Sequence, residues 1–144
     1  MSRSKIRDRK ILFLCRENSC LGFIAEAIAK KLLPPKTQVF RAGPTQGKID
    51  SKVLQVLREI GINVSPEKEN VQDVAAARDI DLIVTLGEPT EALPPVSPRA
   101  RRRTWDMTDP CNKPEADLDA FRNARDEINS RVGGLFLDYW RNVA

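Results

Sequence analysis

The stretch Cys15-Arg16-Glu17-Asn18-Ser19-Cys20-Leu21-Gly22 decides the fold. It follows the apolar run Ile11-Leu12-Phe13-Leu14 and precedes a run from Phe23 to Leu33 in which apolar residues recur at helical spacing. A strand, a short polar loop and a helix in this order build an anion site, because the N–H groups of the loop and of the helix N-terminus point at one spot. The same positive field favours thiolate over thiol, so Cys15 is expected to be a nucleophile.

The pattern on either side of this stretch alternates between strands and helices. Strands are predicted at residues 10–14, 38–41, 80–86 and 102–105. Helices are predicted at 23–33, from a cap at Asp50 or Ser51 to Gly61, at 71–78, and from 117 onward. Alternation of this kind predicts an α/β fold: a four-stranded parallel sheet with helices on both faces, a flavodoxin-like three-layer sandwich. Ligands of such sheets bind at the carboxyl ends of the strands, where the Cys15 loop lies.

Size and composition favour one soluble domain. The chain of 144 residues is 41% hydrophobic and 31% charged, which predicts a single domain over 1–144, with 1–8 as a flexible tail. No apolar run approaches the roughly 20 residues that a membrane span needs, and Arg16 and Glu17 interrupt the run that a signal peptide would require. We therefore expect a cytoplasmic protein with no membrane partner.

The charge pattern and the side-chain inventory exclude several kinds of site. The net charge is +4, and the densest basic cluster, at residues 99–103, lacks interleaved aromatic residues, so no nucleic-acid partner is expected. The absence of histidine excludes Cys-His and Ser-His catalysis and imidazole-bound metals. Cys15 and Cys20 lie five residues apart, and nothing near them in the sequence completes a zinc-ligand set. We expect no metal site and no other cofactor.

The loop resembles that of the low-molecular-weight protein tyrosine phosphatases and of the related thioredoxin-coupled arsenate reductases. Their shared signature is a cysteine, five residues, an arginine and a serine or threonine, directly after the first strand. Cys15, Asn18, Ser19 and Cys20 match it, whereas Leu21 stands at the arginine position and Gly22 at the hydroxyl position. The similarity extends from about residue 10 to the end of the chain, through segments at 41–43, 57–64, 81–86, 105–110 and 121–132.

This resemblance implies a set of roles for the site. Cys15 would be the nucleophile, and Asp109, which precedes a proline, would be the general acid. The anion-binding loop would consist of Arg16, Glu17, Asn18, Ser19, Cys20, Leu21 and Gly22. The implied reaction is hydrolysis of phosphate monoesters through a phosphocysteine. The implied partners are phosphate or another oxyanion, and a phosphotyrosine protein.

Leu21 favours a second hypothesis, a catalytically impaired relative that binds an oxyanion or a partner protein. The missing guanidinium would hold two phosphoryl oxygens, and loss of such a donor costs ~10²–10³ in rate. Arg16 or Arg41 is a candidate replacement. If the Leu21 side chain faces the loop, Leu21→Arg should raise kcat/KM at least ~10-fold. If it packs into the core, the same substitution should cost stability.

A third hypothesis is a thiol redox protein or an arsenate reductase. The resemblance implies a reversible disulfide between Cys20 and Cys15. Arsenate reductases of this type carry further cysteines after the third strand, where this chain has Gly87 and Pro94. Cys111 could replace them only if its loop reaches the site.

Overall fold

In the computed structural model, the described residues are 9–15, 20–42, 49–64, 80–87, 100–113, 115–135 and 137. Several predicted features lie outside these ranges: the tail at 1–8, loop residues 16–19 and the helix at 71–78.

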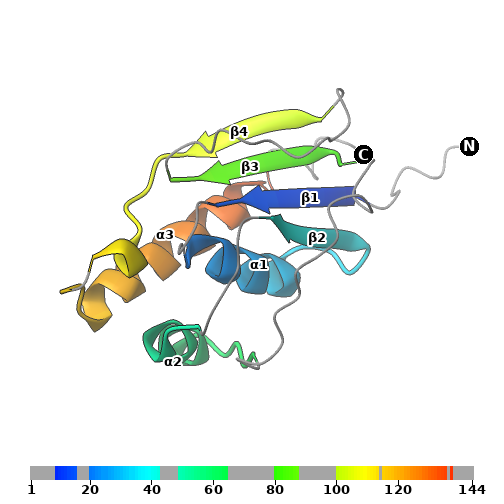
Figure 1. Cartoon of the computed structure of the whole chain (residues 1–144). Helices are drawn as coiled ribbons and strands as arrows, with labels where there is room; N and C mark the ends of the chain where they lie inside the picture. The colour runs from blue at the N-terminus through cyan, green and yellow to red at the C-terminus, as the bar shows by residue number, and fades with distance from the viewer. Residues whose placement is uncertain are drawn as a thin grey trace, which may run out of the picture.

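The sheet has four parallel strands in the order β2-β1-β3-β4 (Figure 1). Their bounds are β1 Arg9–Leu14, β2 Thr37–Ala42, β3 Leu82–Leu86 and β4 Arg101–Trp105. This order confirms the predicted α/β fold class. The strand order reverses between β1 and β3, so the space beyond their carboxyl ends is the place where such sheets bind ligands. Cys15 follows β1 directly, and Gly87 follows β3.

Three α-helices lie in the described part of the chain: α1 Leu21–Leu32, α2 Ser51–Glu59 and α3 Leu118–Leu135. Helix α1 starts two residues earlier than predicted, so Leu21 and Gly22 are helical rather than part of the loop. Asp50 caps α2, with its side chain accepting a hydrogen bond from the Lys52 N–H at 2.8 Å. Gly61 has φ +82°, a left-handed conformation that fits the predicted helix end.

The segment after β4 contains a short 3-10 helix, η3 (Pro110–Asn112), where no helix was predicted. Asp109 caps it, and Pro110 occupies its first position.

All three α-helices pack on one face of the sheet (Figure 1) and share one apolar cluster with it. The apolar side chains of the opposite face are buried too, whereas none of the described α-helices lies on that face. That second cluster consists of Leu12, Leu14, Phe40, Ile80 and Ile83. No helix among the described residues is both long and apolar enough to cross a bilayer.

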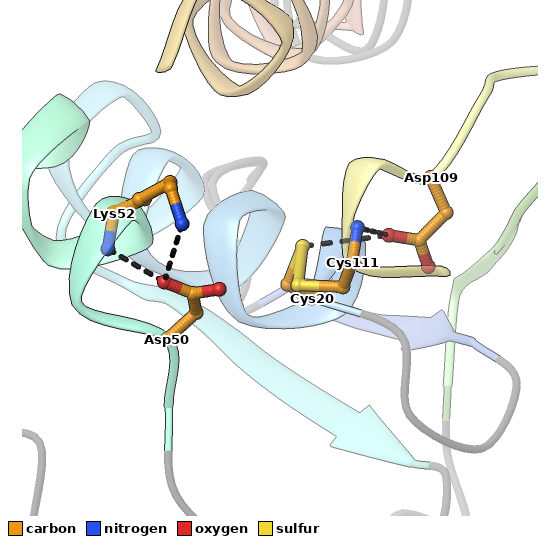
Figure 2. The surroundings of a disulfide bond; sticks show 5 residues. All are labelled: Cys20, Asp50, Lys52, Asp109 and Cys111. Atoms are coloured by element: carbon orange, nitrogen blue, oxygen red, sulfur yellow. Dashed lines mark hydrogen bonds and ion pairs between the residues drawn. A yellow bond between two sulfur atoms is a disulfide. The ribbon is translucent and has the colours of Figure 1, made fainter. Parts of the chain in front are cut away.

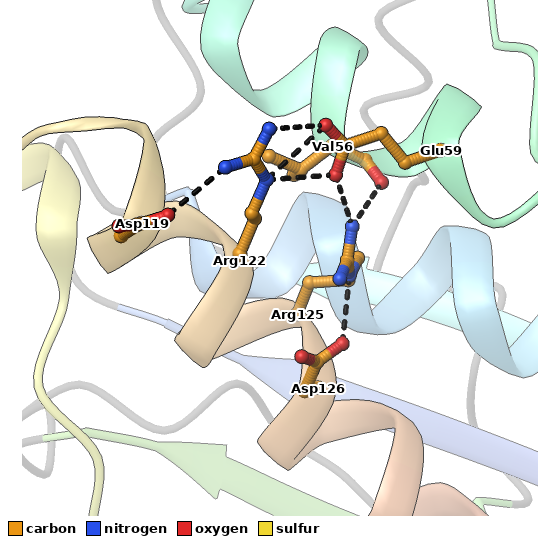
Figure 3. A network of polar contacts seen from close by, with 6 residues as sticks. All are labelled: Val56, Glu59, Asp119, Arg122, Arg125 and Asp126. Carbon is orange, nitrogen blue, oxygen red and sulfur yellow. Dashed lines mark hydrogen bonds and ion pairs between the residues drawn. The ribbon is translucent and has the colours of Figure 1, made fainter.

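A network of ion pairs joins α2 to α3 (Figure 3). Glu59 accepts from Arg122 Nη2 at 2.7 Å and from Arg125 Nη1 at 2.6 Å. Arg122 also pairs with Asp119, and Arg125 with Asp126. The hydrogen bonds from Arg122 and then from Arg125 lower the pKa of Glu59 from 4.5 to about 2.

This shift predicts the acid response of the fold. A depressed carboxyl pKa adds stability that is fully present above the unfolded value of 4.5 and is lost as the pH falls toward about 2. Glu59→Gln should therefore flatten the fall in stability across that window, as measured by urea unfolding at a series of pH values. Glu127→Gln, which removes one exposed pair with Arg131 within α3, is the control and should leave the slope unchanged. Parallel curves for wild type and Glu59→Gln would contradict the prediction.

Candidate functional site

Cys15 lies buried at the end of β1 with 3% exposure. Its sulfur sits against the first turn of α1, because a Cβ placed on Gly22 would be only 2.6 Å from Cys15 Sγ. A side chain at position 22 would therefore require the thiol to move. The positive end of α1 is thus next to the thiol, as the sequence predicted. Cys20, the N-cap residue of α1, makes no side-chain capping hydrogen bond.

Arg41, a charged residue near this thiol, is buried on β2. The same Cβ position on Gly22 lies 3.2 Å from Arg41 Cδ, so the arginine stem and the Cys15 sulfur border one small space. The Arg41 guanidinium donates from Nε to Glu26 Oε1 at 3.0 Å and lies over the Phe23 ring at 5.5 Å. Of the two proposed substitutes for the missing arginine, Arg41 therefore lies beside Cys15, whereas Arg16 lies outside the described residues.

Leu21 has turned into the core and is 0% exposed. A Cβ placed on Gly87 would lie 3.7 Å from Leu21 Cδ1 and 3.6 Å from the Met107 carbonyl oxygen, so the leucine side chain lies against the residue that follows β3. This packing is the second of the two outcomes given for Leu21, so Leu21→Arg is expected to cost stability. Gly87 also has φ +75°, a conformation that the side chain of a cysteine would disfavour.

A disulfide joins Cys20 to Cys111 across a Cα–Cα distance of 5.9 Å (Figure 2). It ties the start of α1 to η3, which follows β4. The partner differs from the predicted one: Cys20 pairs with Cys111, and Cys15 is a buried thiol outside the bridge. The loop of Cys111 therefore reaches the site, which was the condition for Cys111 to replace the cysteines missing after β3.

Asp109 lies beside this disulfide (Figure 2). Its Oδ1 accepts a hydrogen bond from the Cys111 N–H at 3.0 Å and lies 3.4 Å from Cys20 Sγ. The carboxylate is only partly exposed. The predicted acid is therefore brought to the N-terminus of α1, next to Cys20.

The structure thus brings together Cys15, Gly22 and Arg41 on one side of the first turn of α1, and Cys20, Asp109 and Cys111 at its start. Arg16, Glu17, Asn18 and Ser19 were also predicted for the loop and lie outside the described residues. Sequence reasoning missed the buried pair of Arg41 with Glu26, although two such charges in otherwise apolar segments were a usable signal.

The sequence of this chain matches those of known proteins. The model of the low molecular weight phosphotyrosine protein phosphatases matches residues 10–143. The arsenate reductase of Brevibacillus brevis is 34% identical over 125 residues, covering 86% of this chain and 91% of that protein. Arsenate reductase 2 of Staphylococcus haemolyticus is 32% identical over 127 residues, covering 87% and 95%.

The fold comparison agrees. A solved arsenate reductase in its phosphate-binding state superposes with a TM-score of 0.72 at 26% identity, covering 90% of this chain and 97% of that one. The match of the family model over nearly the whole sequence, the relatives above 30% identity and the shared fold lead to one assignment. The chain belongs to the low molecular weight phosphotyrosine protein phosphatase family.

Proposed function

We propose that this chain is a thiol-dependent arsenate reductase in which Cys15 is the nucleophile and Cys20 and Cys111 supply the electrons. The observation that carries the proposal is the Cys20–Cys111 disulfide, which joins the helix beside Cys15 to the Asp109 loop. The resemblance to arsenate reductases supports the choice of substrate. The N-terminus of α1 supplies positive charge for the oxyanion, and the stem of Arg41 borders the same space.

The chemistry balances with these three thiols. The Cys15 thiolate attacks arsenic(V), and one arsenic-bound oxygen leaves as water. The Cys20 thiolate then attacks Cys15 Sγ, and the S–As electron pair stays on arsenic, so arsenite leaves and a Cys15–Cys20 disulfide remains. The Cys111 thiolate attacks Cys20 Sγ, which releases the Cys15 thiolate and leaves Cys20–Cys111 bridged. One arsenate and two thiols become one arsenite, one water and one disulfide.

The different burial of the three cysteines gives the disulfide exchange a direction. Cys15 and Cys20 are 3% and 4% exposed, so an external dithiol has little access to a bridge between them. Cys111 is partly exposed. The final step therefore carries the oxidising equivalent to a sulfur that an external reductant can attack. A cytoplasmic location, where thiols are kept reduced, fits such a cycle.

A single-turnover experiment tests the proposal. Fully reduced protein is mixed with arsenate in the absence of any other thiol, and arsenite and disulfides are quantified by chromatography and peptide mass spectrometry. We expect one arsenite per protein and a Cys20–Cys111 bridge, with Cys15 still alkylatable after denaturation. Bridge formation without arsenite, or no change at all, would reject arsenate reduction.

Cys111→Ser should separate the chemistry from the recycling. The variant should still make one arsenite per protein, because Cys15 and Cys20 remain, but its disulfide should now join those two residues. Steady-state turnover with dithiothreitol should fall at least ~10-fold, because the reductant must reach a buried bridge. Unchanged turnover would show that Cys111 is not on the electron path.

Hydrolysis of phosphate monoesters, including phosphotyrosine, is a second candidate at the same site. The position of Asp109 next to Cys20 favours it, since this carboxyl could protonate a leaving oxygen. The buried Leu21 supplies no guanidinium, so we expect hydrolysis ~10²–10³ slower than with that donor. Loss of aryl phosphate hydrolysis in Asp109→Asn would support this activity, and an equal rate in both proteins would count against it. With no hydrolysis at all, the chain would act on phosphate only as a binder.

A further inference from the structure

We infer that the reduced protein binds a thiophilic divalent cation, Zn²⁺, through Cys20 Sγ, Cys111 Sγ and a carboxylate oxygen of Asp109. This inference goes beyond the proposed function, because it assigns a second ligand to residues for which the sequence predicted no metal. Cys20 and Cys111 are 91 residues apart in the sequence, and only the fold brings them together.

The geometry supplies three converging ligand atoms. One ligand atom from each of these residues lies within 4.8 Å of the other two, and Cys20 is buried. Around a tetrahedral zinc such atoms lie roughly 3.3–3.8 Å apart, as bond lengths of about 2.3 Å to sulfur and 2.0–2.2 Å to oxygen require. Reduction of the bridge frees the two sulfurs to move apart to that spacing.

The carboxylate is already held in place for this role. The Cys111 N–H donates to Asp109 Oδ1 at 3.0 Å, so the backbone of η3 orients the carboxylate toward the sulfurs. Hydrogen bonds of this kind typically fix metal ligands in proteins. Three protein ligands also leave a fourth position for water, as in open zinc sites.

The donor set selects the ion. Two thiolates exclude magnesium and calcium, which take oxygen ligands, and a carboxylate fits zinc better than copper(I). Binding releases two thiol protons to solvent, so it strengthens as the pH rises. Disulfide formation removes both thiolates, so the oxidised protein cannot bind the ion at this site. Zinc and the bridge therefore exclude each other.

The experiment uses the full chain in reduced form and carries Cys15→Ser, so that the third thiol cannot contribute a ligand. Zn²⁺ is titrated in competition with a chromophoric chelator. We expect one equivalent bound, and none in protein oxidised to the Cys20–Cys111 bridge. In the same background, Cys20→Ser and Cys111→Ser should bind at least ~100-fold more weakly, since even outer-shell changes cost ~10–100-fold. Asp109→Asn should bind at least ~10-fold more weakly. Asp106→Asn, an exposed acid three residues away, is the matched control and should bind as the parent does.

A spectrum of the parent protein guards against variants that fail to fold. Cobalt(II) in place of zinc should give tetrahedral d–d bands and a sulfur-to-cobalt charge-transfer band. An octahedral spectrum without that band overturns the inference. It is equally overturned by the absence of binding in the Cys15→Ser background, or by equal affinities of the Asp106→Asn and Asp109→Asn proteins.

Discussion

Arsenite formation should fall by about 10⁴-fold or more in Cys15→Ser, since removal of a nucleophile has cost up to about 10⁶-fold in kcat in other enzymes. Cys15 is the sulfur against the positive end of α1 and next to Arg41, where an oxyanion would be held. A serine hydroxyl there is not ionised at neutral pH and cannot form the S–As bond whose electron pair reduces arsenic. Arsenite release from reduced protein over time measures the effect.

The matched control is Cys111→Ser, which also removes one thiol but should still release one arsenite per protein. Cys15→Ser should retain the Cys20–Cys111 bridge after mild oxidation, which shows that the fold around it survives. Arsenite release by Cys15→Ser at the wild-type rate would mean that another thiol attacks arsenate, and the role given to Cys15 would be wrong.

Leu21→Arg should destabilise the protein by about 3–5 kcal/mol, the usual cost of an uncompensated buried charge. Leu21 is 0% exposed and belongs to the main apolar cluster. The end of its side chain, Cδ1, lies near Gly87. A guanidinium on that side of α1 would meet β3 and the loop after β4 rather than water. Urea unfolding of the reduced protein gives the free energy directly.

Leu32→Arg makes the same chemical change on the same helix, at a side chain that is 41% exposed. Its effect should stay within about 0.5 kcal/mol, because surface substitutions are usually neutral and a cation suits the end of a helix. A stable Leu21→Arg protein that also hydrolyses an aryl phosphate faster would show that the side chain at 21 can reach the anion loop, and would favour the phosphatase activity.

The sheet and its helices were predictable because their signals are local. The apolar run before Cys15 is a buried strand, and Asp50 and Gly61 bound α2 as their capping chemistry indicates. The Asp109-Pro110 pair carries an equally local signal for η3, a capping residue followed by a proline at the first helical position, although no helix was predicted there.

The centre of the site was less predictable because its contacts are not local. Three cysteines allow three pairings, and nothing in the sequence sets the distance between the loop after β4 and the start of α1. The direction of Leu21 depends on where α1 begins. If Leu21 belonged to the loop, its side chain would face the anion. Because α1 begins at Leu21, the side chain instead points into the core.

The bridge between Cys20 and Cys111 closes a loop of 91 residues. In the chain-entropy description, a closed loop of this size destabilises the unfolded chain by roughly 4–5 kcal/mol. A difference of 1.4 kcal/mol is a factor of ten in an equilibrium constant. The unfolded fraction of the reduced chain is therefore on the order of a thousand times larger than that of the oxidised chain. Proteases act on that unfolded fraction, and changes of 1–2 kcal/mol already alter cellular abundance several-fold. If turnover of arsenate oxidises the bridge, as proposed above, exposure to arsenate should lengthen the lifetime of the protein, and its cellular level should rise with that exposure.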